Sequence, residues 1–356
     1  MALYSNENVE KGFSTTKPKS RIKWLDIAKG GSIFMVVLYH VTLFTLDSGF
    51  EVGPLEQFNT SVGPIRMPLF FLVSGLFSAS LIKRDWQVVL TGRFWNLTYL
   101  FFLWSLLFWL FQNFVLSELR DIDPFNISRL LLTWIDPFSS LWFLWALALY
   151  TLITKATYGH KVYSASIAAV TFYLSFDFQD QLSFSQASFL RYILFFQIGV
   201  WFRDKIFYVM EHHVWYCAGL GLIYFPIGFG LAHVEYEVSS YAIMRLTMSL
   251  AGVFLVLCIC RAIELSNVLS IPFIWLGQRT LPIYVLHLML AWLIILPIST
   301  VPAFRETIPG YILAFVVSVL VAIASVALQA FLNRAGLLRL FSAPALLMGR
   351  RIAVRT

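Results

Sequence analysis

The chain has 356 residues, of which 59% are hydrophobic and 13% are charged. A soluble globular domain carries about 25% charged residues. This composition, with a mean hydropathy of +0.76, excludes that class and predicts a polytopic membrane protein. The net charge of +7 is expected to anchor cytoplasmic loops and not to bind nucleic acid.

The chain begins with a polar stretch, residues 1–22, that has no apolar core of the kind found in a signal peptide. We expect it to be a disordered cytoplasmic tail. Ten apolar segments follow, each near or above the roughly 17 residues that cross a bilayer. These segments are 27–46, 67–82, 94–115, 138–154, 162–177, 187–202, 214–232, 240–260, 273–298 and 308–332. Residues 23–333 are therefore predicted to form an all-α domain of ten transmembrane helices, followed by a basic cytoplasmic tail at 334–356.

The basic residues give the orientation of these ten segments. If the N-terminus is cytoplasmic, 20 of the 26 lysines and arginines fall on the inner side of the membrane. Cytoplasmic loops carry such an excess of positive charge. Both termini are therefore predicted to lie in the cytoplasm.

The first segment reads LDIAKGGSIFMVVLYH and carries Asp26, Lys29 and His40. Lys29 and His40 are eleven residues apart, which places them roughly 16 Å apart along a helix and on one face of it. Ionisable residues inside membrane helices are costly and therefore functional candidates. With no serine or cysteine nucleophile motif and no metal-ligand spacing, the simplest chemistry is proton transfer by His40 as a general base. Alternatively, Lys29 is a flanking anchor and His40 a contact between helices.

Three arginines are expected at a depth similar to that of His40, namely Arg66, Arg191 and Arg245. Together they could line a polar cavity that holds an anion or a developing oxyanion. The alternative is that each side chain extends to the membrane interface.

Two further segments carry candidate binding residues. Arg93 opens the third segment at the predicted inner face, where a guanidinium suits a phosphate group. Tyr284 and His287 are three residues apart in the ninth segment and share one face. A buried His287 that is only hydrogen-bonded between helices is the other interpretation. The three cysteines suggest neither a disulfide framework nor a metal site, and no bound cofactor is expected.

Four stretches carry a resemblance to a known family: LDIAKG followed by LYH, then MPLFFLVSGLF, LWFLWAL and LGQRTLPIYVLH. The chain resembles the bacterial acyltransferase-3 family, integral membrane O-acyltransferases that decorate surface polysaccharides. Lysine at the basic position, separated from the histidine by ten intervening residues, is similar to the fucose 4-O-acetylase-like branch. The family typically has two arginines three apart before its third helix, whereas here Arg93 is followed by Asn96.

The resemblance implies an enzyme of the bacterial inner membrane that uses cytoplasmic acyl-CoA as donor, with acetyl expected and succinyl an alternative. The acceptor would be a hydroxyl of a surface or exported polysaccharide or of its lipid-linked precursor. His40 would be the general base, and Lys29 and Arg93 would contact the donor. The alternative is a transporter of glycans or small anions, with the arginines as its pathway. The single line of residues leading to His40, without a visible internal repeat, favours the enzyme.

Overall fold

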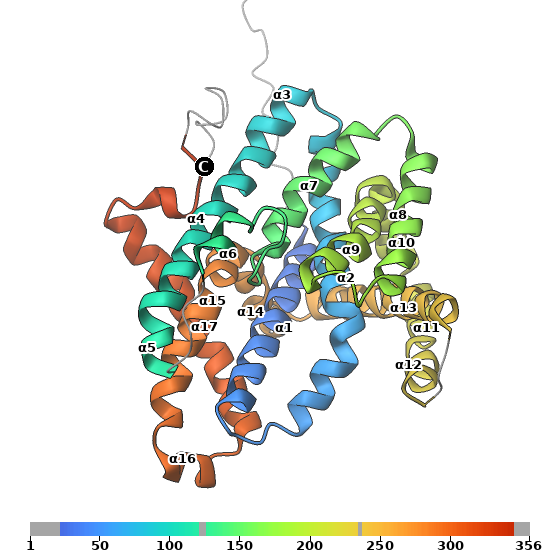
Figure 1. Cartoon of the computed structure of the whole chain (residues 1–356). Helices are drawn as coiled ribbons and strands as arrows, with labels where there is room; N and C mark the ends of the chain where they lie inside the picture. Colours follow the sequence, from blue (N-terminus) through green and yellow to red (C-terminus); the bar gives the residue numbers. More distant parts are fainter. Residues whose placement is uncertain (1–21, 121–125, 234–236, 345–356) are drawn as a thin grey trace, which may run out of the picture.

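The computed structural model describes residues 22–120, 126–233 and 237–344, and Figure 1 shows the path of the chain through them. Helices follow one another throughout these ranges, and no strand occurs within them. The predicted all-α class is therefore confirmed for the described residues. The predicted tails at 1–22 and 334–356 lie outside these ranges, except for Ile22 and residues 334–344.

Six helices of the described ranges are long and apolar enough to cross a membrane. They are α1 (Lys23–Asp47), α2 (Pro54–Ile82), a combined helix over Trp86–Leu119, α13 (Val238–Glu264), α15 (Thr280–Ser299) and α17 (Gly310–Arg334). The combined helix joins α3 (Trp86–Val89), a π-helical turn (Leu90–Phe94), α4 (Trp95–Phe111), a second π-helical turn (Gln112–Leu116) and α5 (Ser117–Arg120). The membrane-protein class is thus supported, while the count of ten spans and the side of each terminus stay predictions.

The remaining described helices are shorter. They are α6 (Ile127–Leu131), α7 (Trp142–Ala156), α8 (Lys161–Asp177), α9 (Phe184–Trp201), α10 (Arg203–His212), α11 (Val214–Gly221), α12 (Tyr224–His233), α14 (Asn267–Gly277) and α16 (Pro302–Thr307). The predicted segments 214–232 and 273–298 are each divided into two helices, because Pro226 and Pro282 are the third residues of α12 and α15. A proline ring clashes with the carbonyl group four residues earlier, so it is tolerated in a first turn but ends a helix before it.

Helix α1 packs against α2, α13, α14, α15 and α17, and so lies at the centre of the described helices. Two glycines allow its close approach to α14. A Cβ atom on Gly30 would lie 2.0 Å from the carbonyl oxygen of Phe273, and one on Gly277 would lie 1.9 Å from that of Asp26. The two backbones are therefore in direct contact at the end of α1 that carries Lys29.

The chain before α7 turns back against the middle of the combined helix. The Trp134 ring stacks on Phe102 of α4, with 5.5 Å between ring centroids. Helix α7 then starts at Trp142 and needs only 15 residues to reach the end of α2. There the Lys155 ammonium donates to the carbonyl oxygens of Ile82 (3.1 Å) and Arg84 (2.6 Å).

The described part of the C-terminal tail packs along α4 (Figure 1). A short 3-10 helix, Leu338–Leu340, supplies carbonyl oxygens to the Tyr99 hydroxyl and the Trp104 indole N–H. Asn96 accepts the backbone N–H of Ala343 at 2.9 Å. Asn96, three residues after Arg93, therefore helps to hold this part of the tail against α4.

Candidate active site

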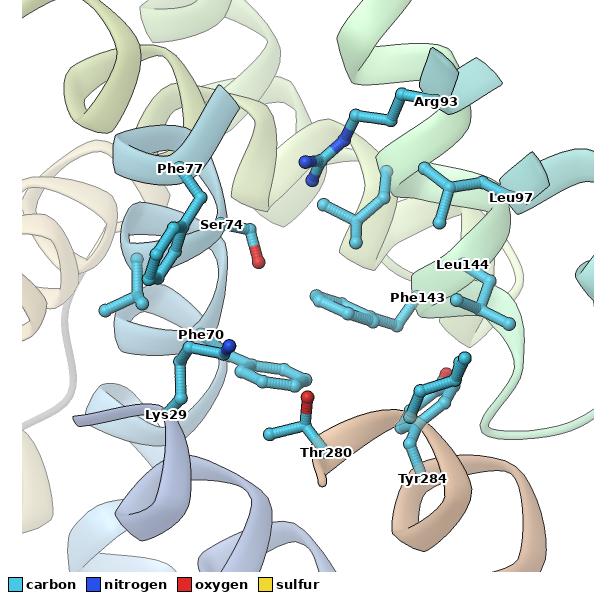
Figure 2. Close-up of a pocket in the computed structure, with 13 residues that line it drawn as sticks. Lys29, Phe70, Ser74, Phe77, Arg93, Leu97, Phe143, Leu144, Thr280 and Tyr284 are labelled. Carbon is cyan, nitrogen blue, oxygen red and sulfur yellow. The ribbon is translucent and has the colours of Figure 1, made fainter. Parts of the chain in front are cut away.

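A cavity of about 210 Å³ lies among the ends of α1, α2, the first π-helical turn, α7 and α15. Figure 2 shows its charged side chains facing each other across the space, with Lys29 on one wall and Arg93 on another. Its other lining residues are apolar or carry a hydroxyl: Phe70, Val73, Ser74, Phe77, Leu97, Phe143, Leu144, Leu147, Thr280, Leu281 and Tyr284. We call this space the donor cavity, after the function proposed below.

Arg93 enters the donor cavity from the π-helical turn Leu90–Phe94. Such turns are rare and occur frequently at functional sites, because the extra residue redirects the side chains next to it. The Nε atom of Arg93 is buried without a hydrogen-bond partner, and no carboxylate pairs with Arg93 among the described residues. A buried cation without a counter-charge is costly, so this side chain is suited to receive an anion from outside the protein.

Lys29 approaches from α1, and its Nζ atom lies 4.8 Å from the centroid of the Phe77 ring. Asp26, one turn earlier, is buried where α1 meets Gly277 and is not among the residues that line the donor cavity. Two cations therefore border the cavity, and the contact of Lys29 and Arg93 with a donor stays a prediction.

The two candidate histidines lie in contact. His287 of α15 is fully buried, and its Nε2 atom is 3.3 Å from Nδ1 of His40 on α1. Each ring also faces a carbonyl oxygen of its own helix: His287 Nδ1 lies 2.6 Å from that of Tyr284, and His40 Nδ1 lies 2.9 Å from that of Val36. Both interpretations of His287, catalytic and structural, remain compatible with this contact.

These distances select one arrangement of hydrogens for a pair of neutral rings. A carbonyl oxygen only accepts, so Nδ1 of His287 carries the hydrogen and its Nε2 holds a lone pair. That lone pair accepts the N–H at Nδ1 of His40, which is shared with the Val36 carbonyl group. Nε2 of His40 is then left unprotonated, in the state a general base requires.

Tyr284 lies next to both the donor cavity and the histidine pair. Its ring lines the cavity, its backbone carbonyl accepts from His287, and its hydroxyl donates to the carbonyl oxygen of Ser140. His40 is not among the residues that line the cavity. The cavity at Lys29 therefore does not extend along α1 as far as His40 in this structure.

The three candidate arginines are not gathered around His40. The Arg66 guanidinium lies 3.9 Å from the ring centroid of Tyr39, whose ring contacts that of His40, and Arg66 also donates to Asn59 at 3.4 Å. Arg191 donates twice to Ser175 of α8. With Arg245 it lines a separate cavity of only about 10 Å³. Depth along each helix was predicted, but the direction in which each side chain points was not.

A second large cavity, of about 340 Å³, lies on the other side of the Tyr284–Ser140 hydrogen bond. We call it the loop cavity, because it is formed by the turns before α7 and the start of α9. It combines hydroxyl, charged and aromatic side chains: Arg129, Asp136, Phe138, Ser139, Ser140, Trp142, Ser183, Phe184 and Ser185, with Pro137. Sequence reasoning missed these loop residues, although the serine and aromatic residues of DPFSSLW and LSFSQ were a visible signal.

Comparison with known proteins identifies the family of the chain. A model of the acyltransferase-3 family, described as an acyltransferase domain, matches residues 22–327. The chain belongs to this family. The match includes α1, the π-helical turn with Arg93, and α15, which together supply the two cations and the two histidines of the site.

Two curated relatives are similar over part of their length. The Nodulation protein NolL of Mesorhizobium japonicum is 26% identical over 153 residues, which are 41% of this chain and 40% of that protein. The Inner membrane protein YcfT of Escherichia coli K12 is 24% identical over 209 residues, which are 53% of this chain and 58% of that protein. The chain therefore matches about half of each relative. No solved structure matches this chain.

Proposed function

We propose that this acyltransferase transfers an acyl group, acetyl in the first instance, from acyl-CoA to a sugar hydroxyl, with His40 as general base. One observation carries the proposal. The two-cation donor cavity and the histidine pair follow one another along the same two helices, with Lys29 and His40 on α1 and Tyr284 and His287 on α15. This order is expected of an enzyme that takes an anionic donor at one end and removes a proton at the other.

The donor cavity suits the thioester end of acyl-CoA. Its volume of about 210 Å³ is below the roughly 300–1,000 Å³ of pockets that bury drug-sized ligands, so the nucleotide would stay outside. Arg93 and Lys29 would contact phosphate groups at the mouth, where a guanidinium binds with two parallel hydrogen bonds and an ammonium acts as a point charge. The apolar walls would enclose the acyl-bearing arm.

In the proposed reaction, His40 Nε2 takes the proton of the acceptor hydroxyl as the oxygen attacks the thioester carbon. The new C–O ester bond forms, the C–S bond breaks, and the CoA thiolate receives the proton back from His40. His287 acts as a positioning residue, because its lone pair keeps the Nδ1 hydrogen of His40 away from the reacting nitrogen. For the thioester to reach His40, the Tyr284 ring must move aside.

The loop cavity suits the acceptor. Sugars present hydroxyl groups and apolar ring faces, and the loop cavity offers serine hydroxyls, charged groups and the rings of Trp142, Phe138 and Phe184. Ser140 connects this cavity to Tyr284. We therefore propose a surface or exported polysaccharide, or its lipid-linked precursor, as the acceptor. The relative YcfT is an inner membrane protein, which supports placing this multi-pass protein in a bacterial inner membrane.

The ester content of the cell's surface glycan tests the enzymatic role. We expect NMR to show loss of O-acyl signals in cells whose only copy carries His40→Ala. His212→Ala is the matched control, because that exposed histidine bonds only within its own helix, to the Tyr208 carbonyl oxygen. Unchanged esters, with the His40→Ala protein present in the membrane, would contradict the proposal.

The donor is tested separately with labelled acetyl-CoA and inverted membrane vesicles. We expect the wild-type protein to bind the label, and Lys29→Ala and Arg93→Gln to bind it more weakly. His40→Ala should bind it normally, because the base acts after the donor has entered. Normal binding by both cation variants would exclude the donor cavity as the acyl-CoA site.

A further inference from the structure

A further cavity, of about 80 Å³, lies where α2 ends, α8 begins and α9 passes into α10. Its lining residues are Ala79, Lys83, Tyr158, Lys161, Val200, Trp201, Arg203 and Asp204. On α2, Ala79 and Lys83 are roughly half a helical turn away from Ser74 and Phe77, which face the donor cavity. The two spaces are therefore on opposite faces of α2, and this cavity is not needed for the acyl transfer proposed above.

Positive charge dominates this cavity. Lys83, Lys161 and Arg203 come from three different helix ends, and Asp204 is the one carboxylate among the lining residues. Asp204 is 3.9 Å from Arg203, and its side chain is 85% exposed, so it neutralises Arg203 only weakly. Two positive charges are left in excess around a space large enough for a few heavy atoms.

Two N–H donors at this cavity have no hydrogen-bond partner among the described residues. The Nε atom of Arg203 and the indole Nε1 of Trp201 are both buried without a hydrogen bond. Buried N–H groups are nearly always satisfied in folded proteins, so an unpaired pair beside a cavity points to an acceptor that binds there. Because both groups only donate, that acceptor must supply oxygen atoms with lone pairs.

The local backbone also favours an anion at this cavity. Lys161 is the first residue of α8 and Arg203 is the first residue of α10, and neither helix has a side-chain cap at its start. Uncapped N–H groups and the positive end of the helix dipole favour anions at such positions. The surrounding helices are also tied together. Gln197 of α9 donates to Ser164 of α8, which is in turn hydrogen-bonded to Thr157 at 2.7 Å.

We propose that this cavity binds a phosphate group, held by Lys83, Lys161 and Arg203 and by the Trp201 indole N–H. The phosphate belongs either to the headgroup of an anionic phospholipid in the adjoining leaflet or to a soluble phosphate compound. Both sources present the same tetrahedral oxygens to the same donors. Asp204 lowers the affinity, because its carboxylate repels the ligand.

The test compares purified protein in nanodiscs of phosphatidylcholine alone with nanodiscs that also contain phosphatidylglycerol, and adds inorganic pyrophosphate as the soluble probe. Thermal unfolding and lipid retained in native mass spectrometry are the measurements. We expect Arg203→Gln or Lys161→Gln to bind about tenfold more weakly, the effect of losing one charge-assisted hydrogen bond. Asp204→Asn should bind more tightly. Lys205→Gln is the matched control, because this exposed neighbour on α10 does not line the cavity.

Each outcome decides between the sources or overturns the proposal. Stabilisation by phosphatidylglycerol that pyrophosphate does not displace identifies a lipid headgroup. Stabilisation by pyrophosphate in phosphatidylcholine nanodiscs identifies a soluble ligand. If neither probe stabilises the protein, or if Lys205→Gln weakens binding as much as Arg203→Gln, the proposal is wrong. The same Arg203→Gln protein should still bind labelled acetyl-CoA normally. Its loss of phosphate binding can then be told apart from damage to the donor cavity.

Discussion

Nε2 of His287 lies 3.3 Å from Nδ1 of His40, and this contact joins two residues that are 247 positions apart in the chain. The Tyr284 carbonyl oxygen, 2.6 Å from the other nitrogen of His287, determines which of the two rings donates. The consequence is chemical. His287, itself fully buried, accepts the Nδ1 hydrogen of His40, which leaves Nε2 of His40 available for the proposed role as a base.

His287→Ala is expected to lower kcat about 10–100-fold, the usual loss when a residue that orients a functional histidine is removed. The KM for acetyl-CoA should stay close to that of the wild type, because the donor cavity does not include His287. The measurement is the rate of acyl transfer to the cell's own glycan in membrane vesicles at several concentrations of acetyl-CoA.

His287→Gln separates positioning from packing. The glutamine side-chain oxygen can accept the Nδ1 hydrogen of His40, so this variant should recover part of the lost rate. If His287→Gln is as slow as His287→Ala while both proteins unfold at the wild-type temperature, the positioning role is wrong.

Arg93→Gln is expected to raise the KM for acetyl-CoA about tenfold or more with little change in kcat, because a charge-assisted contact to phosphate is lost. The KM of Arg93→Lys should lie between those of the wild type and Arg93→Gln, since lysine keeps the charge but not the planar fork of the guanidinium. Arg84→Gln is the control, an exposed arginine beyond the end of α2 that does not line the donor cavity. Equal KM values for all of these proteins would contradict a donor role for Arg93.

Sequence periodicity was sufficient for the first helix. An apolar run of this length had to be a helix, and the eleven-residue spacing put Lys29 and His40 on one face of it. Arg93 was also predicted as a phosphate contact from its place at the opening of a segment, and as a donor contact from the family resemblance. The π-helical turn that directs it inward was not, because five residues of π-helix leave no pattern in the hydrophobic repeat.

Contacts between distant helices could not be predicted in the same way. Hydropathy gives the depth of a residue along its own helix but not the direction of its side chain relative to other helices. The sequence therefore grouped three arginines by depth, namely Arg66, Arg191 and Arg245. In the structure Arg66 contacts Tyr39, and the other two line a separate small cavity. The link between His40 and His287 depends on how α1 and α15 pack, which no local pattern contains.

Gly30→Ala tests the backbone contact between α1 and α14. The added methyl group would overlap the Phe273 carbonyl oxygen, so we expect a loss of about 1–3 kcal/mol of stability and a lower unfolding temperature. Gly31→Ala is the neighbouring control. Nothing lies within 4 Å of its added Cβ, and alanine is favoured over glycine in a helix by about 1 kcal/mol. A Gly30→Ala protein as stable as Gly31→Ala would show that the helices separate without cost.

Tyr284→Phe removes the hydroxyl that bonds to Ser140 and keeps the ring that lines the donor cavity. A ring without this anchor should move aside more often, and water could then reach the thioester beside His40. We expect acetyl-CoA hydrolysis without acceptor to rise and transfer to the glycan to fall. Tyr150→Phe is the matched control, because Tyr150 is also buried and donates to a carbonyl group, that of Phe189 at 2.5 Å, but does not line the donor cavity. Hydrolysis that rises equally in both variants would reflect general loosening of the fold, and hydrolysis that rises in neither would mean that Tyr284 does not control access to His40.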